Sequence, residues 1–353
     1  MRDYPVSLYY THDVPDVQIL DLCRGEHDFR KIYIADDGNR KYVIKQMSNA
    51  FSSRHRIEGW FRLMDAYRNA GIWCPAVVPT LAGERIRTCT AEGRTCCIYA
   101  EEYAVYETAE HIGAENCRND AGNYTYMPDV LRSLGKIAAA RLDFLDWPSA
   151  YCLLEPFSPP DTTDEGTECA LGFRDYVKEN LPRHLPRTEA LLELFFRNQA
   201  ELKKIYHTLP TSCFQGDLNE SNILLDENRQ FAGLIDFNLC GREPVLNYAA
   251  REALWAVDDR CLSGENDACL YCYDRSLDDI RIRSFLRNMA YVQETYPFSD
   301  AEREAFPILL RYMNSFWWQT ISEIQRVHED EDSITKLLDW LEFQMTRDDI
   351  RLP

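Results

Sequence analysis

Residues 213–244 constrain the fold more than any other part of the chain. Their sequence is an apolar stretch interrupted by polar residues, CFQGDLNESNILLDENRQFAGLIDFNLCGREP. Its two short apolar runs, ILL and FAGLI, are separated by DENRQ, in which Asp-Glu-Asn is a typical turn. The pattern predicts a buried β-hairpin. Asp217 lies in the loop before this hairpin, Asn222 directly precedes its first strand, and Asp236 ends its second strand.

These three polar side chains suit one kind of chemistry. A buried strand that ends in a carboxylate is costly unless the charge has a partner, and a divalent cation is a natural one. Mg²⁺ prefers oxygen ligands and takes few of them from protein, so one Asp and one Asn amide suit it. Asp217 could then accept a proton from an attacking hydroxyl. Turn hydrogen bonding would explain any one of the three residues, but the trio favours phosphoryl transfer.

The first hundred residues follow the pattern of a small antiparallel sheet that carries one helix. FRKIYIAD and RKYVIKQM are separated by Asp-Gly-Asn, a strong hairpin signal. Apolar residues at helical spacing then predict a helix, which Ser52 or Ser53 could cap and Gly71 could end. The runs AVVPTLA, RIRTC and RTCCIYAEEY predict three further strands.

The rest of the chain is predicted to be mainly helical. Apolar stripes indicate helices in MPDVLRSLGKIAAARLDFL and RTEALLELFFRNQAELKKIYHTL, and nearly everything after residue 247 follows a helical pattern. The 353 residues, 45% of them hydrophobic, exceed one ordinary domain but suffice for two packed lobes. We therefore expect an α+β protein with a β-rich N-terminal lobe at residues 1–103 and a larger, mainly helical C-terminal lobe at residues 104–353.

Charge and hydropathy restrict the partners and the location. The net charge of −19 disfavours nucleic acid and anionic membranes and favours cationic partners, although an acidic surface can also serve solubility alone. The first residues lack the apolar core of a secretion signal, and no apolar run is long enough for a membrane span. These features predict a cytoplasmic protein and leave its oligomeric state open.

The order of elements and the motif GDLNESNILLD…GLIDF resemble the aminoglycoside phosphotransferase and choline kinase-like superfamily, whose loop H-G-D-x-x-x-x-N is followed by I-D-F. The resemblance covers most of the chain. It implies the two-lobe protein-kinase-like fold, ATP or GTP as the phosphoryl donor, and Mg²⁺. It also implies that Asp217 is the catalytic base and that Asn222 and Asp236 are metal ligands.

The resemblance implies nucleotide-binding residues in the N-terminal lobe as well. YVIKQM resembles the strand that carries the phosphate-binding Lys, which would be Lys45. Such a Lys is usually held by a Glu from the following helix; Glu58 is the expected partner, ahead of Glu84. IYAEEYA resembles the hinge, whose backbone would bind the adenine edge. The hinge residues would be Glu102, Tyr103 and Ala104.

Two departures from the family pattern bear on activity. Gln215 replaces the His before Gly-Asp; that position is structural in the family, and an amide can still form hydrogen bonds. The loop that would cover the phosphates, CRGEHDFRKIY, retains only Gly25 of a glycine-rich loop. A nucleotide-binding pseudokinase is therefore a non-enzyme alternative, but the intact Lys, Asp and Asn of the motifs argue against it.

The expected acceptor is a small molecule, because the chain passes from Asp236 into a helix without the long activation segment of protein kinases. A polycation such as an aminoglycoside would suit the acidic residues 252–279, and choline, homoserine or a sugar are alternatives. Trp255, or the pair Trp317–Trp318, could form an aromatic wall for a choline-like cation, although helix packing would also explain these residues. The candidate acceptor-binding residues are Trp255, Asp258, Asp259 and Glu323.

Overall fold

The computed structural model describes residues 4–25, 27–119, 124–257 and 275–353, which fall into two compact units. The first unit comprises Met1–Gly113, Ser158–Pro160 and Gln215–Cys240, and the second comprises Ala114–Phe157, Asp161–Phe214 and Gly241–Pro353. The lobe division expected after residue 103 stays a prediction. The segment with the expected catalytic motif, residues 215–240, groups with the N-terminal sheet.

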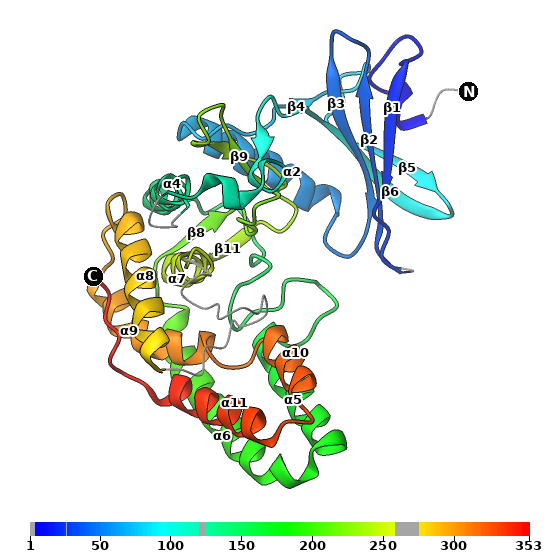
Figure 1. The fold of residues 1–353 in the computed structure, drawn as a ribbon. Helices are drawn as coiled ribbons and strands as arrows, with labels where there is room; N and C mark the ends of the chain where they lie inside the picture. The colour runs from blue at the N-terminus through cyan, green and yellow to red at the C-terminus, as the bar shows by residue number, and fades with distance from the viewer. Residues whose placement is uncertain (1–3, 26, 120–123, 258–274) are drawn as a thin grey trace. The chain divides into compact units, whose positions relative to one another are not determined.

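Antiparallel strands dominate the first unit (Figure 1). Within the described residues, a six-stranded sheet has the order β1-β2-β3-β6-β4, and β5 also pairs with β6. The predicted hairpin of β2 and β3 is confirmed, with Asp36 opposite Lys41. β1 lies beside β2 and was not predicted from the sequence. The strands are β1 (Asp16–Asp21), β2 (Phe29–Asp36), β3 (Lys41–Ser48), β4 (Val77–Val78), β5 (Arg87–Ala91) and β6 (Arg94–Glu102).

Different segments cover the two faces of this sheet. The N-terminal segment buries Tyr10 in one apolar cluster with Ile44 and other strand residues. Because successive strand residues point to opposite faces, Tyr99 lies on the other face of the sheet from Ile98. There it meets helix α2, where Phe61 packs edge-on against Tyr99 with ring centroids 5.4 Å apart. As expected, Ser53 caps α2. The helices of this unit are α1 (Tyr4–Ser7), α2 (Arg54–Asn69) and α3 (Ala109–Ile112).

The predicted hairpin with the catalytic motif also lies in the first unit. β9 (Ile223–Leu225) pairs with β10 (Phe231–Leu234), and β7 (Glu107–Thr108) pairs with the other edge of β9. Gly233 lies against the backbone that follows α2: a Cβ at this position would be 2.3 Å from the carbonyl oxygen of Trp73. That carbonyl oxygen also accepts the N–H of Leu234 at 2.9 Å. The close approach fixes the hairpin to the end of α2.

Helices make up most of the second unit (Figure 1). The helical pattern expected after residue 300 is divided into two helices near Asn314. Within the described ranges, none of the helices is long and apolar enough to span a bilayer. The elements are η1 (Ala114–Cys117), α4 (Met127–Ala140), α5 (Glu165–Asn180), η2 (Pro182–His184), α6 (Leu185–Tyr206), β8 (Thr211–Phe214), β11 (Gly241–Pro244), α7 (Val245–Trp255), α8 (Arg275–Gln293), α9 (Asp300–Met313), α10 (Trp318–Arg326) and α11 (Glu331–Thr346).

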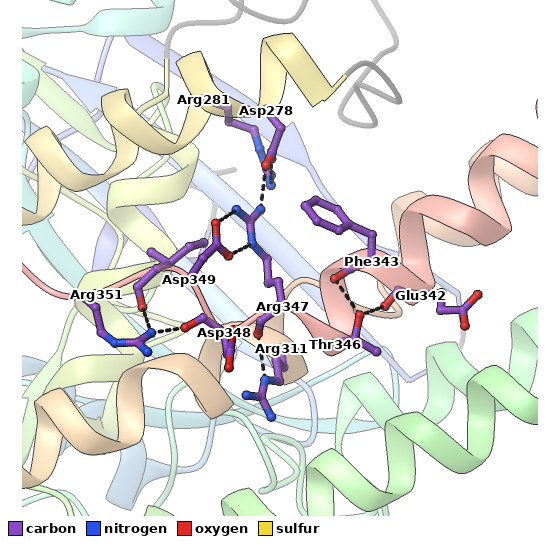
Figure 2. A network of polar contacts seen from close by, with 11 residues as sticks. Asp278, Arg281, Arg311, Glu342, Phe343, Thr346, Arg347, Asp348, Asp349 and Arg351 are labelled. Carbon is purple, nitrogen blue, oxygen red and sulfur yellow. Dashed lines mark hydrogen bonds and ion pairs between the residues drawn. The ribbon is translucent and has the colours of Figure 1, made fainter.

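A buried arginine anchors the C-terminal residues to helices α8 and α9 of this unit (Figure 2). Arg347, directly after α11, lies 2.7 Å from the carboxylate of Asp278 on α8 and 3.0 Å from that of Asp349. Its carbonyl oxygen accepts the Nε–H of Arg311 on α9 at 2.8 Å. Asp278 is also 3.2 Å from Arg281. The acidic Asp278 is therefore part of a structural ion-pair network.

Candidate active site

A glycine determines the path of the loop that leads into β9. Gly216 has φ of 91°, in the left-handed region, and a Cβ there would lie 2.2 Å from the carbonyl oxygen of Leu239. Only glycine combines this conformation with this approach. The loop that carries Asp217 is therefore held against the segment that follows Asp236.

Two amide side chains hold the carboxylate of Asp217. Asn222 Nδ2 donates to Asp217 Oδ2 and to its carbonyl oxygen, both at 3.0 Å. Asn219 Nδ2 donates to Oδ1 at 2.9 Å, and its own Oδ1 accepts the N–H of Ser221 at 3.0 Å. Asn219 was not among the predicted site residues. The amides leave Asp217 as an oriented hydrogen-bond acceptor, the form that a general base requires.

Asn222 and Asp236 present oxygen atoms that fit a hard divalent cation. The carbonyl oxygen of Asn222 accepts the N–H of Ile235 at 3.0 Å, which joins the start of β9 to the end of β10. The side-chain amide of Asn222 donates its hydrogen bonds to Asp217. Its Oδ1 accepts no hydrogen bond from the described residues. Asp236 has φ of 55°, uncommon for a non-glycine residue. One amide and one carboxylate oxygen match the sparse protein ligation of Mg²⁺.

Gln215 bridges the two segments that carry these residues. Its side chain is fully buried. Nε2 donates to the carbonyl oxygens of Ile235 and Asp236 at 3.0 and 2.7 Å, and Oε1 accepts the N–H of Asp217 at 2.6 Å. The backbone N–H of Gln215 donates to the hydroxyl of Tyr67 on α2 at 3.1 Å. The amide thus joins the loop of Asp217 to the segment of Asp236 through hydrogen bonds that involve no titratable group.

We expect Gln215→Ala to lower the free energy of unfolding by about 1–3 kcal/mol, because it leaves buried backbone groups without partners. Gln215→His, which keeps a donor and an acceptor, should recover part of this loss. Urea denaturation of the wild type and both variants measures the difference. An unchanged unfolding free energy in Gln215→Ala would show that the bridge contributes nothing.

Lys45 on β3 lies between two carboxylates. Its Nζ is 3.1 Å from Glu101 Oε2 and 3.3 Å from Asp236 Oδ1. Burial alone would lower the pKa of Lys45, but the charges of Asp236 and Glu101 outweigh it and hold that pKa well above its ordinary value. The side chain is therefore a cation at physiological pH, as phosphate binding requires.

The prediction that Glu58 is the partner of Lys45 is wrong. Glu58 lies on the exposed face of α2, where it forms an ion pair with Arg54 at 3.0 Å. The alternative, Glu84, is paired with a surface arginine. The helical phase turns apolar and aromatic residues of α2 inward, which leaves Glu58 facing solvent. Glu101, one residue before the expected hinge, takes the position beside Lys45.

Comparison with known proteins settles the family. Residues 21–247 match the family described as "Phosphotransferase enzyme family" (APH). The chain belongs to this family. Two solved structures share its fold: a microcompartment-associated aminopropanol kinase (15% identity, TM-score 0.51, 96% of this chain and 93% of that chain) and the amicoumacin kinase hAmiN (15% identity, TM-score 0.54, 96% and 91%). No curated protein sequence matches the chain.

The family match confirms the resemblance drawn from the motif, the kinase-like α+β fold and an enzyme that acts on small molecules. The roles of individual residues remain predictions.

In this phosphotransferase, the expected hinge begins at Glu102, the last residue of β6. The N–H of Glu102 donates to the carbonyl oxygen of Ala76 at 2.9 Å, and that of Tyr103 donates to Lys41 at 3.1 Å. The backbone N–H of Ala104 has no partner among the described residues. Of the three expected hinge amides, only that of Ala104 is therefore available to a nucleotide base.

The candidate acceptor-binding residues of the phosphotransferase belong to the second unit or lie outside the described residues. Trp255, at the end of α7, is 57% exposed. Glu323 is buried and paired with Arg326 at 2.6 Å, so its charge is already compensated. Asp258 and Asp259 lie outside the described residues. The structure thus leaves Trp255 as the accessible candidate within the part of the chain that it describes.

Proposed function

We propose that this phosphotransferase moves the γ-phosphoryl group of ATP to a hydroxyl group of a small, cationic molecule. The observation that carries the proposal is one connected set of side chains within the first unit. Lys45 contacts Asp236, Gln215 joins the Asp236 backbone to Asp217, and Asn222 contacts Asp217. A cation, a carboxylate base and two metal-ligand oxygens are the parts that phosphoryl transfer requires.

Each residue has a separate role in the proposed reaction. Asp217 orients the acceptor hydroxyl and takes its proton as the new oxygen–phosphorus bond forms. The bond between the γ-phosphorus and the β,γ-bridging oxygen breaks, and ADP leaves with that electron pair. Lys45 binds phosphate oxygens through its charge. Asn222 and Asp236 would hold Mg²⁺, which when bound neutralises phosphate charge.

The nucleotide assignment rests on two supporting facts. The related amicoumacin kinase structure contains AMP-PNP and Ca²⁺, an adenine nucleotide together with a divalent cation. In this chain the free N–H of Ala104 follows a strand that ends at Glu102, and could donate to a base. We propose ATP as the donor, with GTP as the alternative.

The cationic acceptor is proposed from the net charge, but two of the acidic residues in 252–279 are already neutralised within the fold. The chain carries −19 overall. Within residues 252–279, however, Glu252 is buried against Arg251, and Asp278 belongs to the network around Arg347. These two carboxylates serve the fold. Asp279 is exposed on α8 and is available to attract a cation, whereas the acidic residues between 258 and 274 lie outside the described residues.

A choline-like amino alcohol is the second candidate acceptor, ahead of an uncharged sugar. Two tryptophans of the second unit, Trp255 and Trp318, are 57% and 53% exposed. Exposed tryptophan faces bind quaternary and primary ammonium groups. An aminoglycoside-like aminosugar and a choline-like alcohol share the features that the proposal needs, a hydroxyl and a positive charge.

We expect the KM for the best acceptor to rise with ionic strength, while the KM for ATP changes less. Long-range attraction to an acidic surface is screened by salt, with a Debye length of about 8 Å at physiological ionic strength. The test measures phosphorylation of aminoglycosides, amino alcohols and neutral sugars, first at low salt and then across a salt series. A neutral or anionic best acceptor, or an acceptor KM indifferent to salt, would contradict the cationic assignment and leave the phosphotransfer reaction standing.

A further inference from the structure

A carboxylate on a strand, and not on helix α2, lies beside Lys45. We propose that Glu101 is the positioning residue that holds Lys45 for the phosphates of the nucleotide, a task that the sequence had assigned to Glu58. The inference rests on the proposed function, because it assumes that Lys45 binds phosphate.

Glu101 and Lys45 form a buried pair within one sheet. Only 6% of Glu101 and 8% of Lys45 are exposed, and Oε2 and Nζ are 3.1 Å apart. In the β3–β6 register, Glu101 lies opposite Val43 and Tyr99 lies opposite Lys45, so the two charged side chains are diagonal neighbours on the same face. On the other side of β6, strand β4 pairs with it and places Val77 opposite Glu101. The carboxylate is therefore held by strands on both sides.

Helix α2 carries no buried acidic residue that could compete for Lys45. Of its two acidic residues, Glu58 is paired with Arg54, and Asp65 lies 3.9 Å from Arg85 and is also paired with Arg68. The inward face of the helix is apolar or aromatic, apart from Arg56 at its start. Phe61 on this face meets Tyr99, the residue opposite Lys45. The helix thus packs beside the pair without supplying its negative charge.

The two carboxylates beside Lys45 differ in what else they do. Asp236 also accepts an amide hydrogen bond from Asn238, at 3.4 Å, and is the proposed metal ligand. Glu101 has Lys45 as its one side-chain partner within the described residues. Binding of a cation by Asp236 would compete with its contact to Lys45, whereas the Glu101 contact has no such competitor. Glu101 is therefore the partner suited to keep Lys45 in place when nucleotide is bound.

The experiment compares Glu101→Gln with Glu58→Gln, since each removes one negative charge and keeps the side-chain length. Mg·ATP affinity is measured by calorimetry without acceptor, and KM and kcat are measured for both substrates. Glu101→Gln should weaken Mg·ATP binding about 10- to 100-fold, the range of a charge-assisted hydrogen bond. Its acceptor KM should change less than about twofold. Glu58→Gln should match the wild type in both measurements.

A double-mutant cycle with Lys45→Met shows whether Glu101 acts through Lys45. Once Lys45 is replaced, Glu101→Gln should produce no further loss of Mg·ATP affinity. Glu101→Asp, which keeps the charge, should recover part of the affinity and serves as the second variant if Glu101→Gln folds poorly. A purely structural role would lower the melting temperature and produce additive losses.

Three outcomes would overturn the inference: wild-type Mg·ATP affinity in folded Glu101→Gln, additive losses in the cycle, or the loss appearing in Glu58→Gln. Binding and transfer are separate readouts. A wild-type protein that binds Mg·ATP but phosphorylates no acceptor would contradict the proposed function alone, and the Glu101 result would still be decided by affinity.

Discussion

Asp217→Asn is expected to reduce phosphoryl transfer by about 10²–10⁴-fold, the scale of general base catalysis, while Mg·ATP affinity stays near the wild-type value. The reason is geometric. Asp217 accepts hydrogen bonds from Asn219 and Asn222, and an Asn side chain keeps the shape but cannot accept the proton of the acceptor hydroxyl. The measurement pairs steady-state turnover with calorimetric titration of Mg·ATP.

Asp226→Asn is the matched control for this prediction. Asp226 lies on the turn between β9 and β10, where its carboxylate accepts the N–H of Asn228 and Gln230 at 2.9 Å. The same chemical change in the same hairpin should leave turnover within about twofold, because it falls on an exposed turn. Near-normal turnover in Asp217→Asn would show that Asp217 is not the base. A parallel loss of nucleotide affinity would instead point to damage in the whole loop.

Asp236→Ala is expected to remove the Mg²⁺-dependent part of ATP affinity. Outer-shell partners of a metal already contribute about 10–100-fold to its binding, so loss of a direct ligand should cost at least about 100-fold. The substitution also removes one of the two carboxylates next to Lys45, at 3.3 Å. Calorimetric titration of ATP with and without Mg²⁺ separates the two effects, because only the metal ligand makes the affinity depend on Mg²⁺.

Asn238→Ala provides the comparison for this variant. Asn238 donates to Asp236 Oδ2 at 3.4 Å and is not a proposed ligand. We expect it to retain Mg²⁺ dependence with a small loss of affinity. If Asp236→Ala binds Mg·ATP as the wild type does, the metal assignment is wrong and Asp236 serves only as a counter-ion for Lys45.

Local sequence signals were sufficient for the hairpin of β9 and β10 and for the strand that carries Lys45. Both are short apolar runs bounded by turn residues, and neither needs information from distant parts of the chain. The partner of Lys45 could not be found in this way. Alternation along β6 places Glu101 on the same face as Tyr99, but only the register between β3 and β6 shows that this face carries Lys45.

The net charge also could not show which carboxylates are available to bind a cation. Glu252, Asp278 and Glu323 all contribute to the net charge of −19, and the sequence offers them as binding residues for a cation. The structure pairs each of them with an arginine at 3.2 Å or less. Whether a carboxylate is neutralised within the fold depends on tertiary neighbours, which composition does not report.

The proposed reaction requires that Asp217, Asn222 and Asp236 form one phosphoryl-transfer site. The most direct test is incubation of the wild-type protein with γ-labelled ATP, Mg²⁺ and a panel of hydroxyl-bearing aminosugars, amino alcohols and sugars. We expect one class of acceptor to become a labelled phosphate ester, with one ADP released per label and no transfer when Mg²⁺ is removed. Binding of Mg·ATP with no labelled acceptor and no ADP above the uncatalysed rate would contradict the account.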